Sequence, residues 1–245
     1  MTHPAVPDVL EALQLLAQPE NLPGMRRFGI NTGRALGVNL PKLRKLARDL
    51  RRDHDLALSL WATGVHEARL LATMVAEPKR LTAAQMEAWA MDFDSWDLCD
   101  GACSNLFSRT SLAWELAPAW AAREEEFVRR AGFVLMATLA VHQKAAPDAA
   151  FLAFFPLLER YAPDDRNFVK KAVNWALRQI GKKNPALRAE ALGLARRIRE
   201  QPHKSSRWIA ADALRELDKK DFLRSGHPDT DHGSSDTNRR PEPRL

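Results

Sequence analysis

The chain has 245 residues, of which 45% are hydrophobic, so it can bury a substantial core and a disordered chain is not expected. Only two cysteines are present, no apolar leader follows a basic cluster, and no apolar run approaches the roughly 20 residues of a membrane span, which predicts a cytoplasmic protein that does not cross a membrane. The net charge of +6 is uneven: residues 81–165 carry −7 and residues 166–224 carry +10. A basic surface in the C-terminal third fits a polyanionic partner such as nucleic acid, but a solvated helical surface explains the charge alone at least as well.

Apolar residues recur at spacings of three and four along most of the chain, and no segment alternates as a strand would, so the sequence predicts an all-α protein. Prolines open several of the expected helices, as in the pair Asn184 and Pro185. A short helix is expected at 22–29. The longer helices are expected at 5–18, 41–52, 54–63, 66–77, 82–92, 95–108, 111–122, 125–142, 147–161, 165–182, 185–200 and 203–218.

Two such helices in every stretch of roughly 35 to 45 residues are typical of a curved solenoid of HEAT-like antiparallel helical pairs, an α-α superhelix. A plain helical bundle would give the same periodicity. The sequence predicts a single HEAT-like domain over residues 1–222. The polar residues 223–245 lack apolar periodicity, which predicts a disordered tail.

An acidic segment opens the helix expected at 95–108. A calcium loop counted from Asp92 would need glycine at its sixth position and glutamate at its twelfth, but aspartate and cysteine stand there. Asp94 or Ser95 is placed to cap a helix that begins near Trp96, and Asp97 lies in the first turn, where a carboxylate complements the helix dipole. These acids therefore have ordinary structural explanations.

Trp96 and Asp100 are different, because a separation of four residues puts both on one helix face, with about 6 Å between their Cβ atoms. An indole face and a carboxylate both favour a cationic ligand. The alternative is that Trp96 packs in the core and Asp100 forms a salt bridge. Cys99 and Cys103 share this spacing, but without nearby histidines they are expected to be small buried residues and not zinc ligands.

Residues 168–178, Phe-Val-Lys-Lys-Ala-Val-Asn-Trp-Ala-Leu-Arg, place Trp175 among the basic residues Lys170, Lys171 and Arg178. Basic residues interleaved with aromatics are typical of phosphate and base-stacking contacts, although a core tryptophan on a basic helix would show the same pattern. No serine-hydrolase, phosphate-loop, dinucleotide or zinc-protease motif is present, which argues against hydrolysis by metal or serine.

Four stretches, taken in order, resemble the AlkD-type family of DNA alkylation repair glycosylases. They are residues 24–28 with 37–41 and Arg44; 95–100; 128–131; and 168–178 with Asn184 and Pro185. Members of this family are HEAT-like solenoids whose concave face cradles duplex DNA and which excise positively charged N3- and N7-alkylpurines. The resemblance therefore implies a DNA glycosylase whose partner is alkylated duplex DNA.

Carried over by motif, the resemblance makes Asp100 the catalytic carboxylate, Trp96 and Trp175 the aromatic walls of the site, and Arg130 a phosphate contact, with Arg129 as the neighbouring alternative. Lys170, Lys171 and Arg178 are expected to bind further phosphates. No metal or organic cofactor is required, and a monomer is expected. Some branches of the family bind DNA with little or no excision, so a non-catalytic DNA-binding solenoid is the main alternative, followed by a protein-interaction scaffold.

Overall fold

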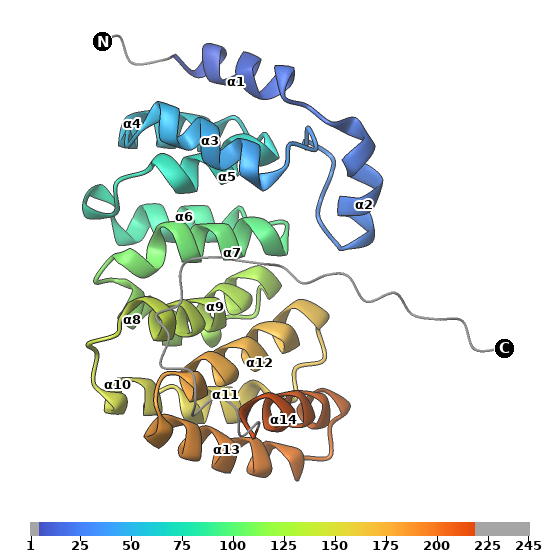
Figure 1. Ribbon diagram of the computed structural model, residues 1–245, viewed down its shortest axis with the longest axis vertical. Helices are drawn as coiled ribbons and strands as arrows, with labels where there is room; N and C mark the ends of the chain where they lie inside the picture. Colours follow the sequence, from blue (N-terminus) through green and yellow to red (C-terminus); the bar gives the residue numbers. More distant parts are fainter. Residues whose placement is uncertain (1–4, 219–245) are drawn as a thin grey trace, which may run out of the picture.

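The computed structural model describes residues 5–218, which form fourteen α-helices, α1 to α14, and three short 3-10 helices, η1 to η3, with no strand in this range (Figure 1). The N-terminal half comprises α1 (Val6–Leu15), η1 (Pro19–Asn21), α2 (Leu22–Arg27), α3 (Leu40–Leu50), α4 (His54–Ala62), α5 (His66–Val75), η2 (Pro78–Arg80), α6 (Ala83–Met91) and α7 (Trp96–Asn105). The C-terminal half comprises η3 (Phe107–Arg109), α8 (Ala113–Ala121), α9 (Glu126–His142), α10 (Asp148–Leu152), α11 (Phe155–Tyr161), α12 (Asn167–Lys182), α13 (Pro185–Arg199) and α14 (Lys204–Leu217).

Five helices pack side by side in the order α5, α7, α9, α12 and α14, and we call them the parallel row. Their side-chain contacts advance in the same direction along each helix, from Lys170 beside Trp208 to Asn174 bonded to Asp212, so neighbours in the row are parallel. Four of them are also packed against the helix that directly precedes them in the chain, in the pairs α4 with α5, α8 with α9, α11 with α12 and α13 with α14, and these pairs stack down the long axis of the molecule (Figure 1). The predicted all-α, HEAT-like architecture is confirmed.

Local sequence explains where many helices begin. The side chains of Asn39, Asp53, Thr82 and Asn184 each accept a hydrogen bond from a backbone N–H in the first turn of the helix that follows. A side-chain acceptor at this position satisfies one of the N–H groups that have no partner within the helix. The predicted helix start at Asn184 is therefore confirmed.

The single helix predicted over 147–161 is wrong, because the structure has two helices there, α10 and α11, separated by a turn at residues 153–154. Pro156 lies in the first turn of α11. Proline has no N–H to give to the preceding turn and its ring crowds the backbone, so it is tolerated at a helix start and disrupts a helix interior.

Aromatic side chains pack between the helices that lie outside the parallel row. The rings of Trp61 and Trp89 stack with centroids 4.0 Å apart, and Phe107 lies 5.8 Å from Trp120. A Cβ atom on Gly132 would lie 2.3 Å from the backbone nitrogen of Ala121, so only glycine allows α8 and α9 to approach this closely. The aromatic contacts therefore join elements outside the parallel row to one another, and the close approach at Gly132 joins α8 to the row.

None of the helices within residues 5–218 is both long and apolar enough to cross a membrane. The tail predicted at 223–245 lies outside the described residues.

Candidate functional site

An ion pair on the parallel row joins three helices. Asp100 of α7 accepts two hydrogen bonds from Arg130 of α9, at 2.8 Å from Nε to Oδ1 and 2.7 Å from Nη2 to Oδ2. Nη1 of Arg130 donates to the backbone carbonyl of Phe168 on α12, at 2.5 Å. The Arg130 side chain is 6% exposed and that of Asp100 is 20% exposed, so the pair is largely buried but the carboxylate still reaches the surface.

Burial raises the pKa of Asp100, and the neighbouring Arg130 guanidinium only partly offsets this rise. Burial lowers the pKa of Arg130, but the Asp100 carboxylate more than compensates, so the pKa of Arg130 is raised overall. The enclosed environment of Arg130 differs from the open phosphate contact expected from the sequence, and its phosphate role stays a prediction. Arg129 is also engaged, in an ion pair with Asp164 at 2.8 Å.

Trp96 is the first residue of α7 and is half-buried. Its indole Nε1–H donates to the carbonyl of Phe28 at 3.0 Å, which fixes the ring against the turn after α2. The next residue, Gly29, has φ +81°, and a Cβ atom there would lie 2.5 Å from the ring of Phe168. The turn at residues 28–29 therefore touches both α7 and α12. Its positive φ and its close approach to Phe168 both favour glycine at position 29.

Helix α7 begins at Trp96 with Ser95 at the N-cap position, as expected, but neither Ser95 nor Asp94 caps it through its side chain. Ser95 is the residue before the helix, but its Oγ accepts from the backbone N–H of Asn31 at 2.8 Å and lies 3.2 Å from Asp94. Asp94 in turn accepts from the Asn31 side chain at 2.8 Å. Asp97 instead bonds within the first turn, to the N–H of Leu98 at 2.9 Å. Asn31, in the turn that follows α2, thus binds the two side chains that the local sequence predicts to cap α7.

A second ion pair was missed by the sequence analysis. His66 at the start of α5 lies 2.8 Å from Asp97 through Nε2 and Oδ2. Burial disfavours a charged His66, but the hydrogen bond and charge of Asp97 outweigh it, so the pKa of His66 is raised. His66 and Asp97 are 31 residues apart, one repeat of the row, and only knowledge of that repeat could have paired them.

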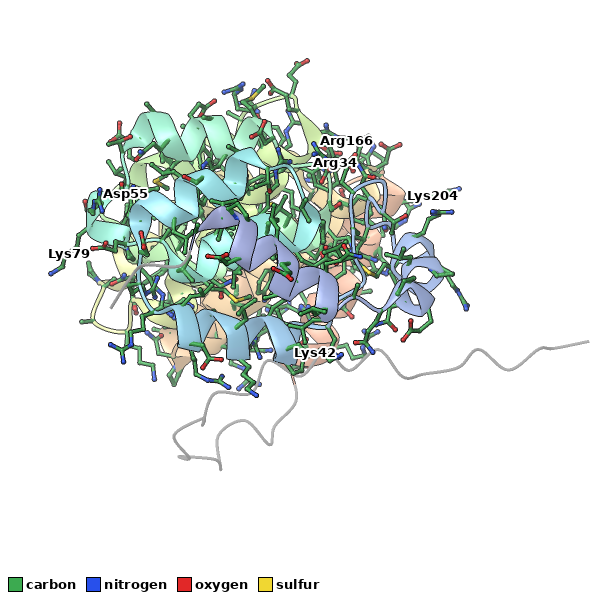
Figure 2. The ribbon with its side chains drawn as sticks, turned by 90° about the horizontal axis from the view of Figure 1, so that it is seen from above. Arg34, Lys42, Asp55, Lys79, Arg166 and Lys204 are labelled. Atoms are coloured by element: carbon green, nitrogen blue, oxygen red, sulfur yellow. The ribbon has the colours of Figure 1, made fainter. Side chains whose placement is uncertain are left out.

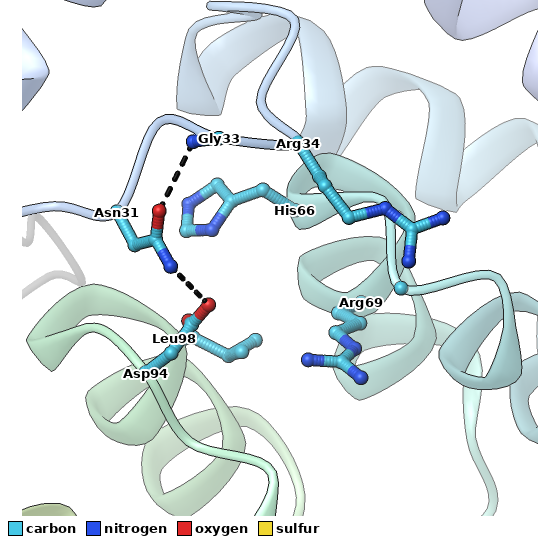
Figure 3. A pocket seen from close by; sticks show the side chains of 8 residues that line it. Asn31, Gly33, Arg34, His66, Arg69, Asp94 and Leu98 are labelled. Carbon is cyan, nitrogen blue, oxygen red and sulfur yellow. Dashed lines mark hydrogen bonds between the residues drawn. The ribbon is translucent and has the colours of Figure 1, made fainter.

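A cavity of about 120 Å³ opens beside this pair (Figure 3). Asn31 bridges it, bonding to Gly33 and Asp94, while His66 and Arg69 come from α5. Sites for small molecules usually span about 300 to 1,000 Å³, so this cavity is small for a ligand pocket. Its lining does not include Trp96 or Asp100.

Trp175 lies on α12 and is partly buried against the core. It is seven residues, or about 10 Å along the helix, beyond Phe168, whose carbonyl binds Arg130. Within the described residues, Trp175 makes no hydrogen bond or ring contact with Trp96 or Asp100. The two predicted aromatic walls therefore lie on the same row of helices, Trp96 on α7 and Trp175 on α12, and their role as walls of one site stays a prediction.

The three α12 side chains expected to bind phosphate differ in how far they are already engaged within the protein. Lys171 is exposed. Arg178 lies 3.5 Å from Asp212 and also pairs with Glu216 of α14, so its charge is largely used within the protein. Lys170 lies over the ring of Trp208, with Nζ 5.1 Å from the ring centroid. The phosphate roles of Lys170, Lys171 and Arg178 stay predictions.

The sequence and the fold of this chain are both similar to those of known proteins. The model of the family described as DNA alkylation repair enzyme matches residues 9–217. The chain belongs to this family. A search of curated proteins returned no match. Among solved structures, the chain is similar to a protein described as one of a new family related to the HEAT-like repeat DNA glycosylases with affinity for branched DNA structures; the TM-score is 0.71 at 18% identity, over 85% of this chain and 94% of that one.

In this DNA alkylation repair family member, both cysteines are free and buried, and burial raises the pKa of the Cys99 thiol. This agrees with the predicted role of Cys99 and Cys103 as small buried residues. Among residues 5–218, no cluster of three or more histidine, cysteine or acidic side chains is arranged to hold a metal ion. The chemical groups that the row presents are an anchored carboxylate, partly exposed indole rings and lysine side chains.

Proposed function

We propose that this DNA repair protein is a monofunctional DNA glycosylase. It binds duplex DNA along the parallel row and hydrolyses the N-glycosidic bond of purines that carry a positive charge from N3 or N7 alkylation. The observation that carries the proposal is the position of Asp100, a partly exposed carboxylate one helical turn from Trp96 and held in place by Arg130.

The chemistry needs little beyond these groups. When the glycosidic bond breaks, its electron pair leaves with the purine and neutralises the positive charge there, while C1′ of the sugar becomes cationic. Asp100 stabilises that developing cation and orients a water molecule, which adds to C1′ and gives up its proton to the Asp100 carboxylate. The indole face of Trp96 favours the cationic state.

Arg130 positions the Asp100 carboxylate and still leaves it able to accept further hydrogen bonds. A carboxylate can accept about four hydrogen bonds, and Arg130 supplies two of them. The remaining lone pairs can face a water molecule or the sugar. A doubly bonded guanidinium also keeps the carboxylate from rotating, which preserves its geometry during the reaction.

The experiment is a single-turnover assay on a duplex that contains one N7-methylguanine, with detection of the released base. Wild-type protein is expected to release the base, and Asp100→Asn is expected to release it at least about a hundredfold more slowly at similar DNA affinity. Release at the same rate by both proteins would contradict the proposal.

A second candidate is a DNA-binding protein without excision activity. It is favoured by the pairing of both Asp100 oxygens with Arg130, and by the fold shared with a protein described as having affinity for branched DNA structures. Tight binding of wild-type protein to a four-way junction, together with no release of N7-methylguanine, would establish this candidate in place of the glycosylase.

A further inference from the structure

The last helix of the parallel row presents a tryptophan that the core does not use. Trp208 of α14 is 42% exposed, whereas Trp61 and Trp120 are 4% and 1% exposed. The indole N–H groups of those two buried residues donate to Asp92 and Glu87. Within residues 5–218, the N–H of Trp208 has no hydrogen-bond acceptor. Water can satisfy this exposed N–H, so the ring and its donor are both accessible to a binding partner.

Basic side chains lie on the two helices that meet at this ring. Lys170 of α12 lies over it, at 5.1 Å from Nζ to the ring centroid. Lys204 is exposed one turn before Trp208 on the same face of α14, and Arg207 and Lys171 are exposed nearby in sequence on α14 and α12. We call these five residues, Trp208 with its four cations, the indole patch.

The acidic residue of α14 nearest to the patch does not cancel this charge. Asp212, one turn after Trp208, accepts a hydrogen bond from Asn174 at 2.7 Å and pairs with Arg215. Arg207 donates to the carbonyl of Pro202 at 3.1 Å, and within residues 5–218 none of the four cations of the patch pairs with a carboxylate, so their positive charge is not neutralised there. Figure 2 shows Lys204 on the same side of the molecule as Arg34, and opposite Lys79.

We propose that the indole patch binds an unpaired base of DNA, which stacks on Trp208 while the lysines hold the adjoining phosphates. The inference rests on the proposed function to the extent that DNA lies along the parallel row. In an intact duplex both faces of a base are covered by its neighbours, so a protein ring can stack only on a base that is unpaired, terminal or extruded. Phosphate contacts to the lysines add affinity for either form of DNA.

This arrangement has a direct consequence for substrate preference. A duplex that contains unpaired bases binds more tightly than a fully paired one, because only the former adds a stacking contact to the phosphate contacts. An exposed tryptophan is suited to this task, since every base has a π face and stacking needs no particular sequence. The preference is therefore for DNA structure and not for DNA sequence.

The test measures fluorescence anisotropy of two labelled, undamaged probes, a fully paired duplex and the same duplex with a short unpaired bulge. Wild-type protein is expected to bind the bulged probe about tenfold more tightly. Trp208→Ala should lose most of this preference while its affinity for the paired duplex changes by less than about twofold. Trp208→Phe should retain part of the preference. Leu15→Ala, which alters an apolar side chain 82% exposed on α1, is the matched control and should keep all of it.

Two results overturn the inference alone: equal affinity of wild-type protein for both probes, or a Trp208→Ala variant that retains the preference for the bulge. If wild-type protein binds neither probe, the proposed function fails together with the indole patch. Because the probes carry no lesion, absence of base excision leaves the result of this test unaffected.

Discussion

Two carboxylates on α7, Asp97 and Asp100, lie one turn apart and are almost equally exposed, at 19% and 20%. Asp97 faces α5, where it pairs with His66, and also accepts a hydrogen bond from the backbone of its own helix. Asp100 faces α9 and pairs with Arg130 alone. Residue type and exposure therefore do not distinguish a structural carboxylate from a candidate catalytic one.

The partners explain the difference between the two ion pairs. Arg130 is always charged, donates to both oxygens of Asp100 in a fixed plane, and leaves lone pairs free. His66 carries a charge only when protonated, so its pairing with Asp97 depends on pH. Arg130 therefore holds Asp100 in a fixed orientation, whereas the pairing of Asp97 with His66 changes with pH.

The largest expected effect separates the two carboxylates directly. Asp100→Asn should slow single-turnover base release by about a hundredfold or more, because an anion facing a developing cation is lost. Asp97→Asn, one turn away, should change the rate by less than about fivefold, since its role is to pair with α5. Affinity for undamaged duplex is the control for both. The reverse ranking of the two variants would exchange the roles assigned here.

Removing a cation should next reveal how much the buried pair contributes to folding. Arg130→Met leaves the carboxylate of Asp100 without its partner and should lower the free energy of unfolding by about 3 kcal/mol. The control is Arg80→Met at the exposed pair with Asp55, where a much smaller loss is expected because water screens the pair. Urea unfolding measures both. Similar losses in the two variants would show that Arg130 acts as an ordinary surface cation.

The ion pair of His66 with Asp97 should raise the pKa measured for His66 by titration. The raised pKa of His66 places its midpoint above the ordinary value of 6.5, whereas burial and the nearby Arg80 lower the pKa of His54 below that value. NMR titration of the ring Cε1–H resonances measures both, and His66→Gln identifies the signal. A midpoint for His66 below that of His54 would contradict the ion pair with Asp97.

These shifts fix the direction of the effect on stability. Because the folded state binds a proton on His66 more tightly than the unfolded state, this contribution is fully present below pH 6.5 and is lost as the pH rises through the folded-state pKa. His54 acts in the opposite direction, since its lowered pKa costs stability as the pH falls below 6.5. His66→Gln should remove only the first effect in urea unfolding at several pH values.

The smallest effect concerns cations on α12. Lys171→Ala should reduce the slope of log affinity against log salt by about 1, with a uniform loss across DNA sequences. Arg178→Ala should reduce it less, because Arg178 already pairs with Asp212 and Glu216. Duplex binding at several salt concentrations measures the slopes. A larger change for Arg178→Ala would mean that its internal pairs open when DNA binds.

The sequence by itself determined the features that depend on near neighbours in the chain. The spacing of apolar residues specified helices, and the four-residue separation of Trp96 and Asp100 placed them one turn apart on α7. The start of α13 at Asn184 and Pro185 followed from local chemistry as well. Such contacts span one helical turn, and helix geometry alone fixes them.

Only the tertiary structure decided which groups meet across the row. Arg130 reaches Asp100 from 30 residues away, and the carbonyl of Phe28 reaches the indole of Trp96 from 68 residues away. Capping of α7 failed as a local prediction for the same reason, because Asn31 takes the hydroxyl of Ser95 across 64 residues. These partners depend on the register in which helices pack, and that register is set by the fit of whole helix faces and not by any short stretch of sequence.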